Sequence, residues 1–282
     1  MFKKKVLTKL IAASIASGVL ILAPNADNFI SMPIIQTSVA HAKSAKDHYN
    51  LGDKYYESGN YNAAIAEYTK AIKINPNLAE VYYNRGVAYA DLKNYDAAIA
   101  DFTKAIELDP QYYKAYNNRG GAYIKLGNYT AAIADYTKAI QINSNNASYY
   151  YNRGVAYGGM GNHNAEIADY TKSIQLNPNM YQAYYNRGNA YCNMQNYDAA
   201  ISDYTKAISI NPNLANAYSN RAIAHAMSGN LNEAINDFTK EIELNPNYAV
   251  AYHNRGVCYE QLGDTARAQA DFAKAKQLGY NG

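Results

Sequence analysis

A four-residue phrase, Tyr83-Asn84-Arg85-Gly86, recurs along the chain and most constrains what the chain can fold into. Self-similarity at a fixed period of this length is the signature of a stacked repeat array rather than of one or two globular domains. Its asparagine returns every 34 residues, at Asn50, Asn84, Asn118, Asn152, Asn186, Asn220 and Asn254. We therefore predict a single array over residues 45–282. Its seven units are 45–78, 79–112, 113–146, 147–180, 181–214, 215–248 and 249–282.

The first half of each unit is expected to be a helix, as residues 79–92 illustrate. This segment has no proline and a single glycine, and it places Tyr82, Gly86 and Tyr89 at helical spacing. Lys93 follows at a position where most other units have glycine, the residue that commonly ends a helix. Those glycines are Gly59, Gly127, Gly161, Gly229 and Gly263.

A second helix is expected in the other half of the unit. Asn94 is a favourable N-cap residue, and Ala98 and Phe102 follow at helical spacing. The helix should stop before Pro110, because the proline ring cannot continue it. Each unit thus predicts two antiparallel helices joined by a tight turn.

The order of small and aromatic residues within a unit resembles the tetratricopeptide repeat. In the second unit these residues are Tyr82, Gly86, Ala98, Phe102 and Ala105, followed by the closing proline. The resemblance covers residues 45–282. It implies an all-α solenoid of seven antiparallel helix pairs that form a right-handed superhelix with a concave groove for protein partners.

An arginine stands in the phrase where that family usually has an apolar residue. Arg85 has Asp101 late in the second helix of its unit, and each later unit repeats the combination. On antiparallel helical wheels the two positions lie on the same side, so we predict an ion pair within each unit. The alternative is a role in capturing an anionic ligand. The first unit has Leu51 and Glu67 instead.

The asparagine column is the candidate binding site. A helical wheel places Asn84 opposite the face that contacts the second helix, so it should face solvent. Neighbouring outward positions vary freely between units, whereas all seven asparagines are retained. A carboxamide has donors and an acceptor, so it can pair with an extended peptide backbone. The column resembles the asparagine ladder of O-linked N-acetylglucosamine transferase.

We therefore predict that the seven asparagines form a peptide-binding ladder. Tyrosines beside them are candidates for gripping peptide side chains: Tyr49, Tyr83, Tyr151 and Tyr185. The alternatives remain open at this point. The asparagines could be structural or merely solvated, and the tyrosines could pack between units.

Residues 1–42 share nothing with the repeat and have the pattern of a cleaved signal peptide. A basic segment ends at Lys9, and an uncharged apolar run from Leu10 to Ala23 follows. The segment closes on Ala40-His41-Ala42, a small-x-small pattern that predicts cleavage after Ala42. The apolar run is shorter than the roughly 20 residues of a spanning helix, so we expect no stable membrane anchor. The alternative is a retained N-terminal anchor.

The charge balance and the absence of catalytic and metal-binding motifs argue against a nucleic-acid-binding protein, a metalloprotein or an enzyme. Residues 1–42 contain four lysines and one aspartate, and without them the chain has 22 basic and 22 acidic residues. This balance gives no broad basic surface for nucleic acid. Cys192 and Cys258 lie two units apart, too far for a disulfide. No histidine has partners at metal-ligand spacing, and no catalytic motif interrupts the repeat.

We accordingly expect no enzyme activity, no cofactor and no metal. The sequence favours an exported scaffold, in the periplasm, a lumen or outside the cell, that binds a protein or peptide partner in an assembly or adaptor role. The alternative is a structural or oligomerisation module of the cell envelope without a peptide-binding groove.

Two places depart from the repeat pattern. Two isoleucine columns in the second helices become Gln269 and Lys276 in the last unit, so we expect the array to end there. Glu166 replaces a small alanine close to three glycines in residues 158–161. Because glycine weakens a helix end, we expect residues 144–166 to be the least stable part of the array.

The signal-peptide interpretation predicts the N-terminus of the mature protein. N-terminal sequencing of protein recovered from its native compartment should read from Lys43, since cleavage is expected after Ala42. A mature chain that begins at Met1 would contradict export by cleavage.

Overall fold

Each unit folds into the predicted pair of helices. The structure, a computed structural model, describes residues 43–281, and within them it contains fourteen helices and no strand. The expected signal peptide at residues 1–42 lies outside this part. The first helices are α2 (Ala45–Glu57), α4 (Ala79–Asp91), α6 (Tyr113–Lys125), α8 (Ala147–Gly159), α10 (Tyr181–Asn193), α12 (Ala215–Met227) and α14 (Ala249–Gln261). The second helices are α3 (Tyr61–Ile74), α5 (Tyr95–Leu108), α7 (Tyr129–Ile142), α9 (His163–Leu176), α11 (Tyr197–Ile210), α13 (Leu231–Leu244) and α15 (Thr265–Gln277).

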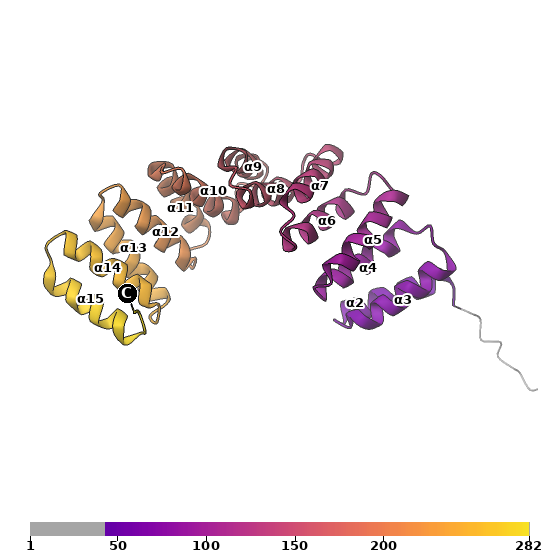
Figure 1. Cartoon of the computed structure of the whole chain (residues 1–282), viewed down its shortest axis with the longest axis horizontal. Helices are drawn as coiled ribbons and strands as arrows, with labels where there is room; N and C mark the ends of the chain where they lie inside the picture. The colour runs from indigo at the N-terminus through magenta and orange to yellow at the C-terminus, as the bar shows by residue number, and fades with distance from the viewer. Residues whose placement is uncertain (1–42, 282) are drawn as a thin grey trace, which may run out of the picture.

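The pairs stack along an arch with α2 and α15 at its two ends (Figure 1). Each second helix packs on its own first helix and on the first helix of the next pair. First helices of successive pairs also contact one another, as α4 does with α2 and α6, and second helices do not meet to that extent. The first helices therefore lie on the inner side of the curve. The predicted all-α solenoid with a concave groove is confirmed.

The turns inside the pairs are built as the sequence indicates. The Asn94 side chain accepts a hydrogen bond from the Ala97 N–H at 3.3 Å, and equivalent caps begin most other second helices. Asn230 makes no such bond. The residue before the cap has a positive φ in every unit, which explains the glycines there. Lys93 and Gln195 adopt the same conformation, with φ of 61° and 60°.

Small residues let the two helices of a pair come close together. A β-carbon added to Gly154 would lie 2.8 Å from the Tyr170 ring, and the other phrase glycines face an aromatic ring in the same way. The alanines of the second helices, such as Ala98 and Ala105, are fully buried. The core is consequently thin, with alanine and aromatic rings in alternation.

The predicted ion pairs form in all six units that have the arginine. Arg153 donates from Nε and a terminal nitrogen to the two carboxylate oxygens of Asp169, at 2.7 and 2.8 Å. Its other terminal nitrogen donates to Thr137 of the preceding unit at 2.9 Å. The hydrogen bond to Asp169 raises the pKa of Arg153. The arginine therefore links both helices of its unit to the unit before, and sequence analysis missed this threonine.

The first and last units each lack one partner of the bond between arginine and threonine. The threonine recurs in six units and becomes Ala273 in the last, which has no following arginine to bind. The first unit has no preceding threonine and carries Leu51 in place of arginine. There Glu67 instead accepts from His48 Nδ1 at 2.6 Å and pairs with Lys70.

The glycines near the end of α8 make room for larger neighbours. A β-carbon on Gly158 would lie 2.6 Å from a Glu166 carboxylate oxygen, and one on Gly159 would lie 2.4 Å from the Tyr129 ring. Glu166 is buried and bonds His163 Nδ1 at 2.9 Å. Helix α8 has the same length as the other first helices. Low local stability of residues 144–166 stays a prediction.

The structure also shows the environment of the two cysteines and the character of the helices. Cys258 is buried, Cys192 is half-buried, and both are free thiols. Over residues 43–281, none of the helices combines the length and the apolar character needed to cross a membrane.

Two adjacent glycines in α6 give a matched prediction. A β-carbon on Gly120 would lie 2.9 Å from the Tyr136 ring, whereas one on Gly121 would meet nothing closer than the Tyr136 hydroxyl at 3.8 Å. Gly120→Ala should lower the free energy of unfolding by about 1–3 kcal/mol through overpacking. Gly121→Ala should raise it by about 0.5–1 kcal/mol, because alanine favours the helix. Urea unfolding of the two variants measures both effects, and equal destabilisation would contradict this packing.

Candidate functional site

The asparagine column links the second to sixth units to the unit before each of them. Asn118 Nδ2 donates to the Tyr83 hydroxyl at 3.1 Å, and Asn186 Nδ2 donates to the Tyr151 hydroxyl at 3.1 Å. Asn84 and Asn220 make the same bond to Tyr49 and Tyr185. Each bond spans 35 residues in sequence and joins two successive first helices. The asparagines and tyrosines that sequence analysis selected thus lie together along the inner side of the array.

The wheel-based expectation that these asparagines face solvent was only partly right. Asn50, in the first unit, is exposed. The other six are half-buried, because the preceding unit approaches them and takes up one amide hydrogen of most. A role in the fold was not evident from the sequence of one unit. The inter-unit hydrogen bond gives these asparagines that role.

The carbonyl end of the same side chains stays open. Within residues 43–281 the Oδ1 atoms of Asn84, Asn152, Asn186 and Asn220 accept no protein hydrogen bond. They are not enclosed either, since the buried polar atoms without a partner in this region are on His225 and Glu241. The column therefore presents a row of amide oxygens that can each accept one hydrogen bond.

The candidate aromatics pack chiefly within their own units. The Tyr83 ring lies 5.9 Å from the Phe102 ring and 4.9 Å from the Tyr112 ring, centre to centre. The Tyr151 ring lies 5.7 Å from that of Tyr170. Burial raises the pKa of Tyr83 and Tyr151, so both phenols stay protonated at neutral pH. Each ring is half-buried, with one part in the core and another at the groove.

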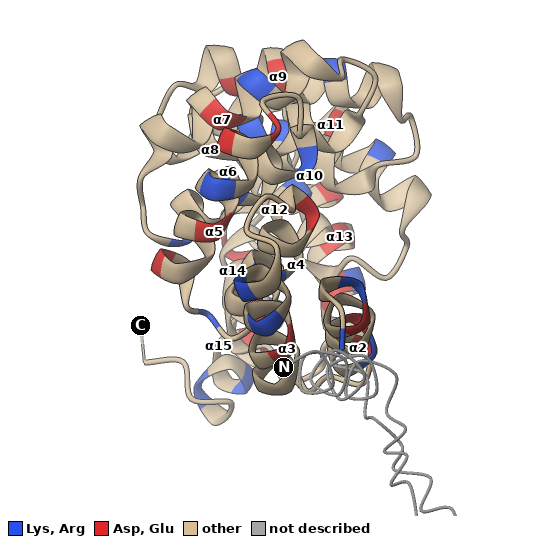
Figure 2. Cartoon of the chain, turned by 90° about the vertical axis from the view of Figure 1, so that its right-hand side faces the viewer, with Lys and Arg blue, Asp and Glu red and all other residues tan. Residues whose placement is uncertain are grey.

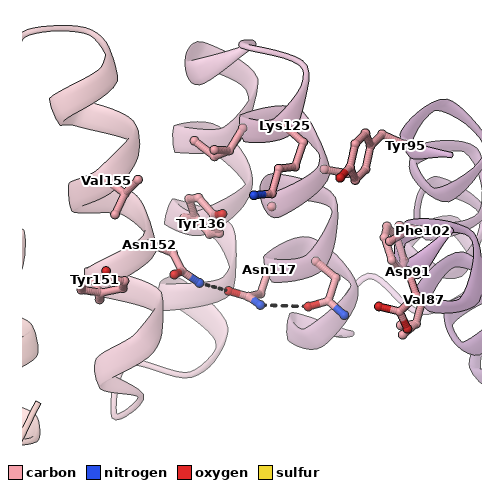
Figure 3. Close-up of a pocket in the computed structure, with 15 residues that line it drawn as sticks. Val87, Asp91, Tyr95, Phe102, Asn117, Lys125, Tyr136, Tyr151, Asn152 and Val155 are labelled. Carbon is pink, nitrogen blue, oxygen red and sulfur yellow. Dashed lines mark hydrogen bonds between the residues drawn. The ribbon is translucent and has the colours of Figure 1, made fainter. Parts of the chain in front are cut away.

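Cavities open along the same line. One of about 520 Å³ lies between α4, α6 and α8 and includes Asn118 and Asn152 in its walls (Figure 3). Two smaller ones, of about 260 and 280 Å³, are lined by Asn84 and by Asn220. The recurrence of cavities at ladder asparagines makes the inner side of the first helices the candidate site.

Sequence analysis missed a second column in this groove, three residues after each asparagine. Its members are Asp53, Val87, Gly121, Val155, Asn189, Ile223 and Val257. Asp53 and Asn189 accept hydrogen bonds from the Tyr68 and Tyr204 phenols, at 2.7 and 2.8 Å. The variation of this column between units is visible in the aligned repeats and could have indicated where the groove differs along its length.

Basic and acidic residues are interspersed along the helices. Lys and Arg alternate with Asp and Glu over the helices in view in Figure 2. No group of three or more His, Cys, Asp and Glu side chains that could hold a metal ion occurs within residues 43–281.

Comparison with known families assigns the repeat. Sequence models described as tetratricopeptide repeat or TPR repeat match successive stretches that together run from residue 52 to residue 270. The matches are 52–93, 79–112, 102–134, 120–161, 147–180, 181–214, 215–248 and 238–270. The chain belongs to the tetratricopeptide repeat family. A search of curated proteins found no match.

Solved structures with the same repeat resemble the chain. MamA is 29% identical, with a TM-score of 0.57, over 61% of this chain and 93% of MamA. YrrB, described as a TPR protein with an unusual peptide-binding site, is 25% identical, with a TM-score of 0.59, over 66% of this chain and 96% of YrrB. The C-terminal part of a TPR repeat-containing protein from Cytophaga hutchinsonii has a TM-score of 0.73 at 22% identity. That match covers 83% of this chain and 96% of the other and shows the fold alone.

The inter-unit hydrogen bond of the tetratricopeptide array is interrupted near its C-terminal end. Ser219 stands where four other units have tyrosine, and the Asn254 side chain makes no hydrogen bond within residues 43–281. In the same unit Glu241 replaces the alanine of the second-helix core and is 1% exposed. Its Oε2 has no partner, and burial raises the pKa of this carboxyl group.

Glu241 therefore predicts a pH-dependent stability. Between its ordinary pKa of 4.5 and its raised pKa in the folded protein, the unfolded chain loses a proton that the folded chain keeps. Stability should consequently fall as pH rises from 4.5 towards neutral. Glu241→Ala should remove this dependence and stabilise the protein by about 1–3 kcal/mol at neutral pH.

Urea unfolding of Glu241→Ala at acid and neutral pH measures the effect. The exposed Glu243, on the same helix and paired with Lys240, provides the control Glu243→Ala, which should show little change. If Glu241→Ala changed the free energy of unfolding by the same amount at both pH values, the carboxyl group would not be buried without a partner.

Proposed function

We propose that the protein is an exported interaction scaffold that binds an extended segment of a partner protein along the first helices of the array. The observation that carries the proposal is the row of unpaired amide oxygens in the groove. In Asn84, Asn152, Asn186 and Asn220 the inter-unit bond fixes the carboxamide in one orientation and leaves its oxygen for a partner. Preorganised acceptors of this kind bind without an ordering cost at the moment of association.

An extended peptide backbone offers what this row requires. Its N–H groups recur at regular intervals whatever the side chains are, so a row of acceptors can hold it with little dependence on sequence. In this proposal Asn50, Asn84, Asn118, Asn152, Asn186, Asn220 and Asn254 are the ladder. The rings of Tyr49, Tyr83, Tyr151 and Tyr185 contact the peptide side chains. The peptide-binding description of YrrB supports this class of function.

Export is the second part of the proposal. It is supported by the basic and apolar segments of residues 1–42 and by the small-x-small pattern that ends at Ala42. The mature protein then acts in the periplasm, a lumen or the extracellular space, in an assembly or adaptor role without catalysis.

One observation favours a second candidate function. The bonds from asparagine to tyrosine also join the units, so the column could serve stacking alone. The protein would then be a structural or oligomerisation module of the cell envelope. The two functions differ in whether the amide oxygen is used, and paired variants can separate them.

The test compares Asn186→Ala/Asn220→Ala with Tyr151→Phe/Tyr185→Phe. Both double variants delete the bonds from Asn186 to Tyr151 and from Asn220 to Tyr185. The asparagine variant also deletes the bond from Asn220 to Asn189, and only this variant removes the two free oxygens. Binding of fluorescent peptides of about ten residues, which extend over roughly 33 Å, can be followed by anisotropy. We expect the asparagine variant to lose more than about tenfold in affinity and the tyrosine variant to keep its affinity.

Circular dichroism and thermal unfolding provide the control. Both variants should keep their helicity, and the asparagine variant should lose more stability because it also lacks the bond from Asn220 to Asn189. Equal peptide affinity in the two variants would reject the ladder and favour the structural module.

A further inference from the structure

The third unit departs from its neighbours at the cavity of about 520 Å³ between α4, α6 and α8. Where the second and fourth units have Tyr83 and Tyr151, the third has Asn117. Where they have Val87 and Val155, it has Gly121. Both replacements remove side-chain volume from the cavity wall (Figure 3).

The glycine is not required by packing. A β-carbon on Gly121 would meet only the Tyr136 hydroxyl at 3.8 Å, an ordinary van der Waals distance. The neighbouring Gly120, by contrast, faces the Tyr136 ring at 2.9 Å. Because glycine disfavours the middle of a helix, Gly121 weakens α6 and leaves open space in return.

The hydroxyl of Tyr136 opens onto this cavity and has no hydrogen-bond partner within residues 43–281. Tyr136 is 2% exposed and lines the cavity beside Gly121. The equivalent phenols Tyr68 and Tyr204 donate to Asp53 and Asn189, three residues after the phrase asparagine. Gly121 has no side chain to accept such a bond, and the Tyr136 hydroxyl makes none within residues 43–281. Burial raises its pKa, so it keeps its proton as a donor.

The amides around the cavity are held in place. Asn152 Nδ2 donates to Asn117 Oδ1 at 3.0 Å, and Asn117 Nδ2 donates to Asn118 Oδ1 at 3.0 Å (Figure 3). Asn118 in turn donates to the Tyr83 hydroxyl. This chain of bonds crosses three units and keeps Asn117 from turning into the space that a tyrosine ring occupies in neighbouring units.

The aromatic ring that the third unit lacks indicates which kind of ligand group fits the cavity. In the second and fourth units a tyrosine ring packs on the aromatic ring of the second helix, Tyr83 on Phe102 and Tyr151 on Tyr170. In the third unit the corresponding ring of Tyr136 has no such neighbour from Asn117. Val87, Val155 and Ile124 add apolar groups to the wall, which also includes the charged Asp91 and Lys125. An aromatic ring from a ligand would restore the contact that the unit lacks.

We infer that this cavity binds one tyrosine side chain of the bound peptide, with its ring on Tyr136 and its hydroxyl oxygen accepting the Tyr136 proton. The inference rests on the proposed function, since the tyrosine belongs to a segment that lies in the groove. The tyrosine site gives the groove a preference for one peptide side chain at the third unit, whereas the asparagine ladder binds only the peptide backbone.

The probe for this site is N-acetyl-L-tyrosinamide, with the phenylalanine, leucine and alanine amides for comparison, followed by NMR of the ¹⁵N-labelled full chain. We expect tyrosinamide to shift the backbone amide signal of Ala122 and the side-chain amide signal of Asn152, which both line the cavity. It should bind about fivefold more tightly than phenylalaninamide. Tyr136→Phe should abolish that difference. Equal binding of alaninamide, or an undiminished tyrosine preference in Tyr136→Phe, would overturn the inference.

The variant Asn117→Tyr/Gly121→Val fills the cavity with the residues of the neighbouring units. It should fold, gain thermal stability and lose the tyrosinamide shifts. The control Ile223→Val changes the same column three units away and should keep them. Shifts that persist in the filled variant would place the probe elsewhere and overturn the inference.

Failure of this inference is distinguishable from failure of the proposed function. If ten-residue peptides depend on Asn186 and Asn220 but show no preference for tyrosine, the tyrosine site fails and the ladder stands. If tyrosinamide binds as expected while peptide affinity is indifferent to those asparagines, the tyrosine site stands and the backbone ladder fails.

Discussion

The arginine of the repeated phrase holds the array together. In the fourth unit Arg153 bonds both oxygens of Asp169, a threonine of the preceding unit, and lies over the Tyr150 ring at 5.8 Å. A buried carboxylate without this partner would be strongly destabilising, so the pair fixes which two helices meet and how. The bond to Thr137 then sets the next unit at the same position each time. The last unit has Ala273 in place of the threonine, and the first has Leu51 in place of the arginine.

Regular stacking gives the groove its chemistry. Because every unit is placed alike, the asparagines fall into one row. Four of them donate to the tyrosine of the unit before, and Asn152 donates to Asn117 instead. The same side chain thus has two roles. Its nitrogen bonds the preceding unit, and its oxygen remains accessible in the groove. In our proposal the regular row binds peptide backbone, and departures such as Gly121 determine which side chains are accepted along it.

The sequence predicted the features that depend on one unit. Helix pairs, the caps at Asn94 and its equivalents, and the pairing of Arg85 with Asp101 follow from helical periodicity within 34 residues. Contacts between units could not be predicted from wheels, because they depend on how far the array curves. For this reason the bond from Arg85 to Thr69 and the bond from Asn84 to Tyr49 were missed. The reason for the glycine at Gly158 also depends on a neighbouring helix, because it makes space for the Glu166 carboxylate, while low stability of residues 144–166 stays a prediction.

The central claim is that the amide oxygens of the ladder receive the backbone N–H groups of a bound segment. The most direct measurement is the structure of the protein with an extended peptide of about ten residues in the groove. The account predicts peptide nitrogens at about 2.9 Å from Oδ1 of Asn84, Asn186 and Asn220, with the bonds to the preceding tyrosines intact. A peptide bound elsewhere, or held in the groove through its side chains alone with these oxygens still unpaired, would contradict it.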